Sequence, residues 1–335
     1  MAYQNVGTPR FYVNVLGWLA SNNELEQQAP SGIGGNLSSQ IRTLPVVPYD
    51  WMQGYMGIIA LPYSLFQMTP SNRFVAVLGY TLDTDLNRYA IQVDGVDLTL
   101  TPLVNGTGST EISPSYNGFS ISKIDDTIDA PFAFITYGDD DVSLQKIGSI
   151  VLGTYYDINA PNLSLTMSRE YGGTKEFTTH NGSSMSNTMW SKPPKWGNLG
   201  AWELGDGNPA LAKSGRKTWQ LKFSFMDDGS LWGSNQGLSY GIVSYQDQVD
   251  NGEMEQVDVN VGGGLLEYNI LTDDNFFSQV WHKTLGGPLP FLFQPDSSNN
   301  SPDQFCIARF KDNSLKATQS SFNVYDISLS IEEVW

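Results

Sequence analysis

Apolar and polar side chains alternate over short runs along most of this chain, and turn-forming residues separate the runs. Gly, Pro, Asn and Ser recur about every 8 to 15 residues, a spacing typical of all-β proteins. We therefore expect a mainly β fold. The runs predict strands at 74–80, 118–124, 132–137, 147–156, 218–225, 291–293, 305–310 and 324–334.

The clearest local signal is a hairpin at residues 89–100. Asp94-Gly95 favours a two-residue turn between two runs of alternating apolar residues. This turn places three apolar pairs on one face: Val93 with Val96, Ile91 with Leu98, and Tyr89 with Leu100. A half-buried hairpin is therefore predicted here.

One helix is expected after the acidic capping signal at 272–274. Its apolar stripe consists of Phe276, Phe277, Val280, Trp281 and Leu285. Gly286-Gly287-Pro288 ends the pattern, because glycine takes the left-handed conformation that closes many helices.

The pattern divides the chain into three regions. Residues 1–45 form an N-terminal arm, residues 46–160 a β-sandwich of jelly-roll type, and residues 161–335 a second β domain with one helix. Residues 180–215 lack clear periodicity and are expected to form a long loop that is functional or orders on assembly. The predicted core of the third region is Trp219, Leu221, Phe223, Phe225, Trp281, Phe291, Ile327, Leu329 and Ile331.

Tryptophans outside the periodic runs are candidate interface residues, because tryptophan is enriched at subunit interfaces. The candidates are Trp190, Trp196, Trp202 and Trp335. One alternative is that Trp190, Trp196, Trp202 and Trp232 stack on sugar rings; packing into the core or a subunit interface is the favoured interpretation.

Composition narrows the function classes. The 335 residues carry a net charge of -17, and 12% of them are aromatic, which argues against disorder. The acidic balance disfavours binding to nucleic acid or to an anionic membrane. The start, residues 1–10, does not resemble a secretory signal, and no apolar run is long enough to span a membrane. A single cysteine, Cys306, excludes an internal disulfide.

Catalytic motifs are weak. Residues 237–241 match the G-x-S-x-G pattern around Ser239, but a polar stretch precedes them and a strand pattern follows, whereas a nucleophile elbow needs a strand and then a helix. The two histidines, His180 and His282, have no metal-binding partners in sequence. Residues 83–94 open like a calcium loop but lack its glycine and final glutamate, which leaves only a looser calcium site open. We therefore expect no enzyme, no cofactor and no metal centre.

Four segments occur in an order that resembles the distal tail proteins of long-tailed bacteriophages. They are Lys217 to Phe225, Asn275 to Trp281, Pro290 to Asp296 and Tyr325 to Val334. The resemblance covers roughly residues 160–335 and implies a tail-tube-like split β-barrel that assembles into rings. Residues 74–153 are similar, more weakly, to discoidin-like jelly rolls of virion proteins.

The resemblance implies a structural virion protein of the tail tip or baseplate, assembled in the host cytoplasm. Its expected partners are further copies in a six-fold ring, the tail tube and the tail hub or fibre. An acidic lumen would repel DNA phosphates, which agrees with this role. Two alternatives remain: a glycan-binding module for host recognition, and another tail ring protein such as a tube or neck subunit.

Overall fold

The computed structural model describes part of the chain. The described residues are 5–22, 49–52, 56–61, 69, 71–80, 88–93, 95–104, 106–108, 110–114, 118–126, 132–137, 145–147, 149–170, 175–186, 195–196, 199–200, 215–233, 270–271 and 273–334. The protein is mainly β, as predicted.

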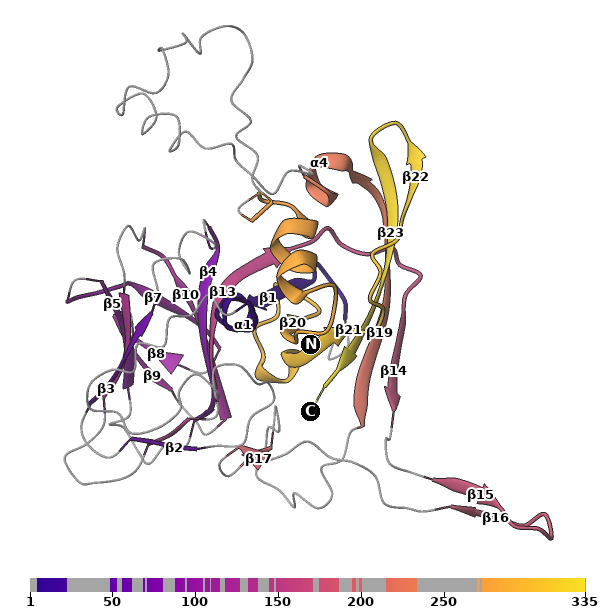
Figure 1. The fold of residues 1–335 in the computed structure, drawn as a ribbon, viewed down its shortest axis with the longest axis horizontal. Helices are drawn as coiled ribbons and strands as arrows, with labels where there is room; N and C mark the ends of the chain where they lie inside the picture. The colour runs from indigo at the N-terminus through magenta and orange to yellow at the C-terminus, as the bar shows by residue number, and fades with distance from the viewer. Residues whose placement is uncertain are drawn as a thin grey trace, which may run out of the picture.

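One long antiparallel sheet runs through the whole described structure (Figure 1). Its strands, in spatial order, are β14 (Thr166–Glu170), β19 (Arg216–Asp227), β23 (Val324–Glu333), β21 (Cys306–Phe310), β20 (Phe291–Gln294), β1 (Arg10–Asn14), β13 (Ser149–Asp157), β4 (Arg73–Tyr80), β10 (Gly118–Ile124) and β7 (Leu100–Val104), with β22 (Ala317–Ser321) also paired to β23. Seven of the eight predicted runs form strands of this sheet, with ends shifted by at most two residues, and the run at 132–137 forms a strand of the second sheet.

A second sheet faces the β13, β4 and β10 part of the long sheet. Its strands are β3 (Met56–Leu61), β11 (Phe132–Tyr137), β5 (Arg88–Val93), β9 (Glu111–Pro114) and β8 (Gly106–Thr107), with β6 (Val96–Asp97) paired to β5. Short two-stranded pairs complete the described strands: β2 (Tyr49–Met52) with β12 (Gln145–Ile147), β15 (Glu176–Thr178) with β16 (Ser184–Ser186), and β17 (Lys195–Trp196) with β18 (Leu199–Gly200).

The predicted hairpin at 89–100 forms only in its first half. Val93 pairs with Val96 across the turn, where Gly95 has a φ of 80°. Beyond Leu98 the chain leaves this sheet, and β7 pairs with β10 in the long sheet instead. The turn therefore starts a hairpin whose second strand crosses from one layer to the other.

The prediction of an N-terminal arm at residues 1–45 is wrong for residues 10–21. Strand β1 lies in the middle of the long sheet, paired on one side with β13 and on the other with β20. The helix α1 (Val15–Ser21) follows directly, and its first six residues are buried. The prediction failed because local alternation of side chains does not reveal which strands a segment pairs with. As a result of its pairing, β1 joins the two predicted domains into one continuous sheet.

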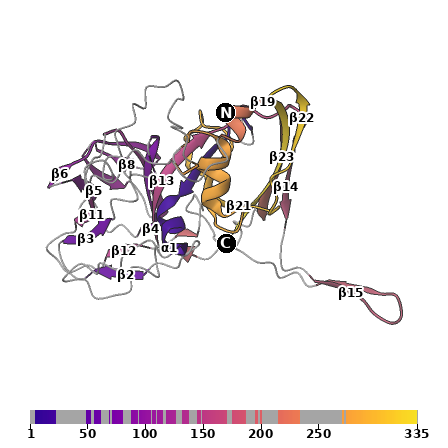
Figure 2. The ribbon, with the colours of Figure 1, turned by 45° about the horizontal axis from the view of Figure 1, so that its top comes forward.

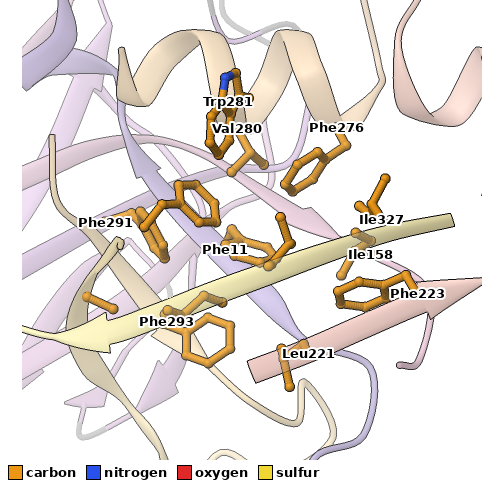
Figure 3. Close-up of a cluster of buried hydrophobic side chains, with 14 of the residues drawn as sticks. Phe11, Ile158, Leu221, Phe223, Phe276, Val280, Trp281, Phe291, Phe293 and Ile327 are labelled. Atoms are coloured by element: carbon orange, nitrogen blue, oxygen red, sulfur yellow. The ribbon is translucent and has the colours of Figure 1, made fainter. Parts of the chain in front are cut away.

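Three apolar clusters form the core. The first lies between the two sheets and includes Val75, Ile91 and residues of α1. The second lies in the C-terminal half and includes Phe11 of β1 (Figure 3). The third covers the other face of the long sheet, from Phe119 across Tyr12 to Ile307. Because β1 and β4 are buried on both faces, neighbouring residues of one strand belong to different clusters.

The predicted helix is short and irregular. It consists of a π-helical turn, η1 (Phe277–Trp281), and a 3₁₀ turn, η2 (His282–Thr284). Residue 272 of the predicted cap lies outside the described residues. The side chain of Asn275 accepts a hydrogen bond from Ser278 N at 2.8 Å and caps the turn. The described chain contains two further short helical segments, α4 (Asp228–Leu231) and η3 (Pro302–Gln304).

Candidate assembly surface

The C-terminal half packs one face of β19, β20, β21 and β23 onto the helix η1 (Figure 3). Strand β19 alternates as predicted at its start, with Trp219, Leu221 and Phe223 buried and the intervening side chains more exposed. Of the nine residues predicted for this core, eight are buried: Trp219, Leu221, Phe223, Trp281, Phe291, Ile327, Leu329 and Ile331.

Phe225 is the exception, and the prediction that it belongs to the core is wrong. A β-bulge shifts the register of β19 against β23 between Phe223 and Met226. The extra residue turns Met226 into the core, while Phe225 is 82% exposed with a φ of 60°. The carboxylate of Asp326 accepts a hydrogen bond from Phe225 N at 3.1 Å and holds the bulge.

Strand β14 is the last strand at one edge of the long sheet. It pairs with β19 on one side, and its other side pairs with no strand among the described residues. All five of its residues are exposed, including the apolar Met167. An open edge presents backbone donors and acceptors that another strand is able to pair with.

After β14, the hairpin β15–β16 projects away from the rest of the described protein in both ribbon views (Figures 1 and 2). Gly182 at its turn has a φ of 79°, and Thr179 and Ser183 close the turn with hydrogen bonds. Phe177 and Met185 lie directly opposite each other on the two strands. Both are more than half exposed, so the hairpin carries an apolar pair into solvent.

The four candidate tryptophans lie mostly outside the part described. Trp190, Trp202 and Trp335 are not among the described residues, and Trp196 is described only as part of strand β17. Strand β17 lies against β4 of the same chain. The region 180–215, predicted as a loop, therefore includes the short strands β16, β17 and β18 in its described parts.

The histidines and the cysteine occupy unrelated places. His180 lies at the exposed turn of the β15–β16 hairpin, whereas His282 is half-buried beside Trp18, and burial lowers the pKa of His282. Burial also raises the pKa of the Cys306 thiol well above its usual value. Ser239 and residues 83–87 lie outside the described residues. The described ranges contain no group of three or more His, Cys, Asp or Glu side chains placed to hold a metal ion.

Across the described residues, no helix has both the length and the apolar character needed to span a bilayer.

Sequence reasoning missed the hairpin and its apolar pair. Asn181-Gly182 is a strong turn signal, and it lies between two short runs that each contain one large apolar residue. Those runs are only three residues long, too short for alternation to stand out. The turn dipeptide was therefore the one signal available.

Comparison with known proteins gives no further guide. No protein-family model, curated protein or solved structure matches this chain significantly. The described residues form a mainly β protein whose long sheet ends at β14, a strand open on one side among those residues and followed by a projecting hairpin.

Proposed function

We propose that this protein is a structural subunit of a bacteriophage tail, several copies of which form a ring at the distal tail. The observation that carries the proposal is strand β14, an edge strand exposed over its whole length and open on one side within the described chain. An open edge strand in a free protein offers backbone donors and acceptors that another chain is able to pair with. When the partner is a further copy, a head-to-tail contact closes into a ring if its rotation permits.

The resemblance of residues 160–335 to distal tail proteins supports this proposal, and it assigns roles to the regions. Residues 161–335, completed by β1, form the ring as a tail-tube-like split barrel. Residues 46–160, a jelly-roll-like sandwich, decorate the rim and are the region that would contact host glycan. The ring, expected to be six-fold, connects the tail tube to the hub or fibre after assembly in the host cytoplasm.

The negative charge of each copy predicts how ring assembly depends on salt. Each copy carries a net charge of -17, so copies repel one another over long range. Added salt screens this repulsion, because the Debye length falls from about 30 Å at 0.01 M to about 8 Å at 0.15 M. Ring formation through backbone pairing and apolar contacts should therefore strengthen as salt is added.

The test is light scattering over a range of protein and salt concentrations, with negative-stain images of the same fractions. We expect particles of one defined mass and ring-shaped images. The double substitution Met167→Lys with Ser168→Lys places two charges on β14 and should weaken assembly. Val96→Lys, at a 67% exposed position of the sandwich, is the control.

Two outcomes contradict different parts of the proposal. A protein that stays monomeric at all concentrations and salt conditions contradicts ring formation. Rings that survive the two lysines in β14 leave ring formation standing but remove β14 from the interface.

A further inference from the structure

Three large apolar side chains are exposed at one end of the C-terminal sheet, and we call them the distal patch: Leu163, Phe225 and Phe322. Each is more than 80% exposed. A scattered exposed apolar residue needs no explanation, but a group of large ones at one place marks an interaction site.

Hydrogen bonds bring these three residues to the same end of the sheet. Asn162, next to Leu163, donates through its side chain to Ser224 Oγ at 2.9 Å, next to Phe225. The turn between β22 and β23 contains Phe322, and its Asn323 carbonyl accepts a hydrogen bond from Asp228 N at 3.0 Å. The distal patch is therefore built from three segments tied to the last residues of β19.

The strained backbone of Phe225 is a second sign that its exposed side chain is functional. A bulky residue at a φ of 60° is a backbone outlier that glycine or asparagine would occupy with less strain. The bulge holds this strained backbone and places the ring of Phe225 in solvent. In the isolated chain, that exposure brings no stabilising contact. Strain of this kind is concentrated at functional sites.

The β15–β16 hairpin supplies a surface that matches the distal patch. Phe177 and Met185 form one apolar face, and Glu176, Thr178 and their partners form the polar face. A lone two-stranded hairpin is marginally stable in water, so contact with a partner would stabilise it. The hairpin follows β14 at the start of β19, whereas the distal patch lies at the end of β19, roughly 30 Å along the strand. The two surfaces thus lie at opposite ends of one sheet layer, as Figures 1 and 2 show for their elements.

The edge of the distal patch is acidic, whereas the hairpin turn carries no acidic residue. Asp227, Asp228 and Asp326 lie beside the distal patch, and hydrogen bonds from Ser230 keep the pKa of Asp227 low. The hairpin turn, residues 179–183, contains no acidic residue and has His180 near its tip. An acidic rim around an apolar patch suits a turn without acidic residues better than the acidic surface of the rest of this chain.

We propose that the β15–β16 hairpin of one copy docks on the distal patch of a second copy. The proposal rests on the proposed function, because it names a second contact, in addition to the edge of β14, by which copies associate. Phe177 and Met185 of the first copy cover Phe225 and Phe322 of the second. Because the two surfaces differ and lie at opposite ends, the contact is head-to-tail. Each copy offers its hairpin to one neighbour and its distal patch to another.

The test is a double-mutant cycle on the full-length protein, with association measured by sedimentation equilibrium and light scattering. The hairpin variant is Phe177→Ser with Met185→Ser. The patch variant is Phe225→Asn with Phe322→Ser, in which asparagine tolerates the left-handed backbone. Val96→Ser, an exposed apolar residue of the sandwich, is the matched control.

Each variant should raise the dissociation constant for association about thirtyfold or more, the usual effect of removing a buried aromatic anchor at an interface. The combined variant should be little worse than either alone, because both remove the same contact. Thermal unfolding of each dilute variant should match that of the wild type or, for Phe225→Asn, occur at a higher temperature. The control should associate like the wild type.

The outcomes separate this contact from the proposed function. Rings that form with unchanged affinity in either variant overturn the contact and leave the proposed function intact. Effects that multiply in the combined variant overturn the pairing of these two surfaces. A wild type that is monomeric at every concentration overturns both.

Discussion

Replacing Lys283 with methionine is expected to stabilise the protein near neutral pH. Lys283 is 1% exposed, and its Nζ donates a hydrogen bond to Gln279 Oε1 at 2.8 Å. Burial lowers the pKa of Lys283 from 10.5 to about 7, and the negative charge of Asp274 opposes that shift. Methionine has a similar length and no charge to desolvate, so it fits the site at little steric cost.

The magnitude follows from the lowered pKa. At pH 7 the shift from 10.5 to about 7 corresponds to about 4 kcal/mol of lost stability. Losing the hydrogen bonds of the ammonium group offsets about 1–2 kcal/mol of the gain. Gln279 Oε1 keeps a second donor, the hydroxyl of Thr154 at 3.3 Å. The net expectation is a stabilisation of about 2 kcal/mol at pH 7.

The stability difference between Lys283→Met and the wild type should decrease as the pH rises. Between pH 7 and 10.5 the unfolded chain binds a proton at Lys283 that the folded chain does not bind, so the stability of the wild type rises with pH. The advantage of Lys283→Met should therefore shrink by about 2 kcal/mol between pH 7 and pH 9. Buried groups with raised pKa values, such as Tyr89 and Cys306, titrate equally in both proteins and cancel in the comparison.

Urea unfolding followed by tryptophan fluorescence at pH 7 and pH 9 measures both quantities. Lys283→Gln is a useful companion, because it removes the charge and keeps a hydrogen-bonding side chain. An equal difference between Lys283→Met and the wild type at the two pH values would refute the reasoning, as would a variant less stable than the wild type at pH 7.

Three further predictions concern the central strand β1. Gly153→Ala should lower the free energy of unfolding, measured in urea, by about 3 kcal/mol or more. The new Cβ would lie 1.9 Å from Val13 O and force β1 and β13 apart. A near-neutral change would show that the two strands separate easily. Phe11→Ala should cost about 3–5 kcal/mol, since this ring is fully buried, and an unshifted thermal transition would argue against a shared core. Arg10→Gln should cost only about 1 kcal/mol, because its paired hydrogen bonds to Asp157, at 2.6 and 2.7 Å, are partly exposed; the loss should diminish in high salt, and a salt-independent loss would point to packing instead.

The assembly surface was only partly predictable from sequence. Alternation placed Trp219, Leu221 and Phe223 in the core, yet the same alternation placed Phe225 there too. Two adjacent apolar residues, Phe225 and Met226, compete for one inward position, and only the pairing with β23 decides between them. Exposure of Phe177 and Met185 likewise depends on where the hairpin projects, which its own short strands do not determine.

By itself, the sequence determined the mainly β class and the places of most long strands, because side-chain alternation and turn residues act locally. The tertiary structure alone decided how those strands join. Strand β1 looks like any short apolar run at the start of the chain, but pairing with β13 and β20 places it at the centre of one sheet. Strand pairing links residues far apart along the chain, so the number of domains and the free edge at β14 emerge only when the sheet is assembled.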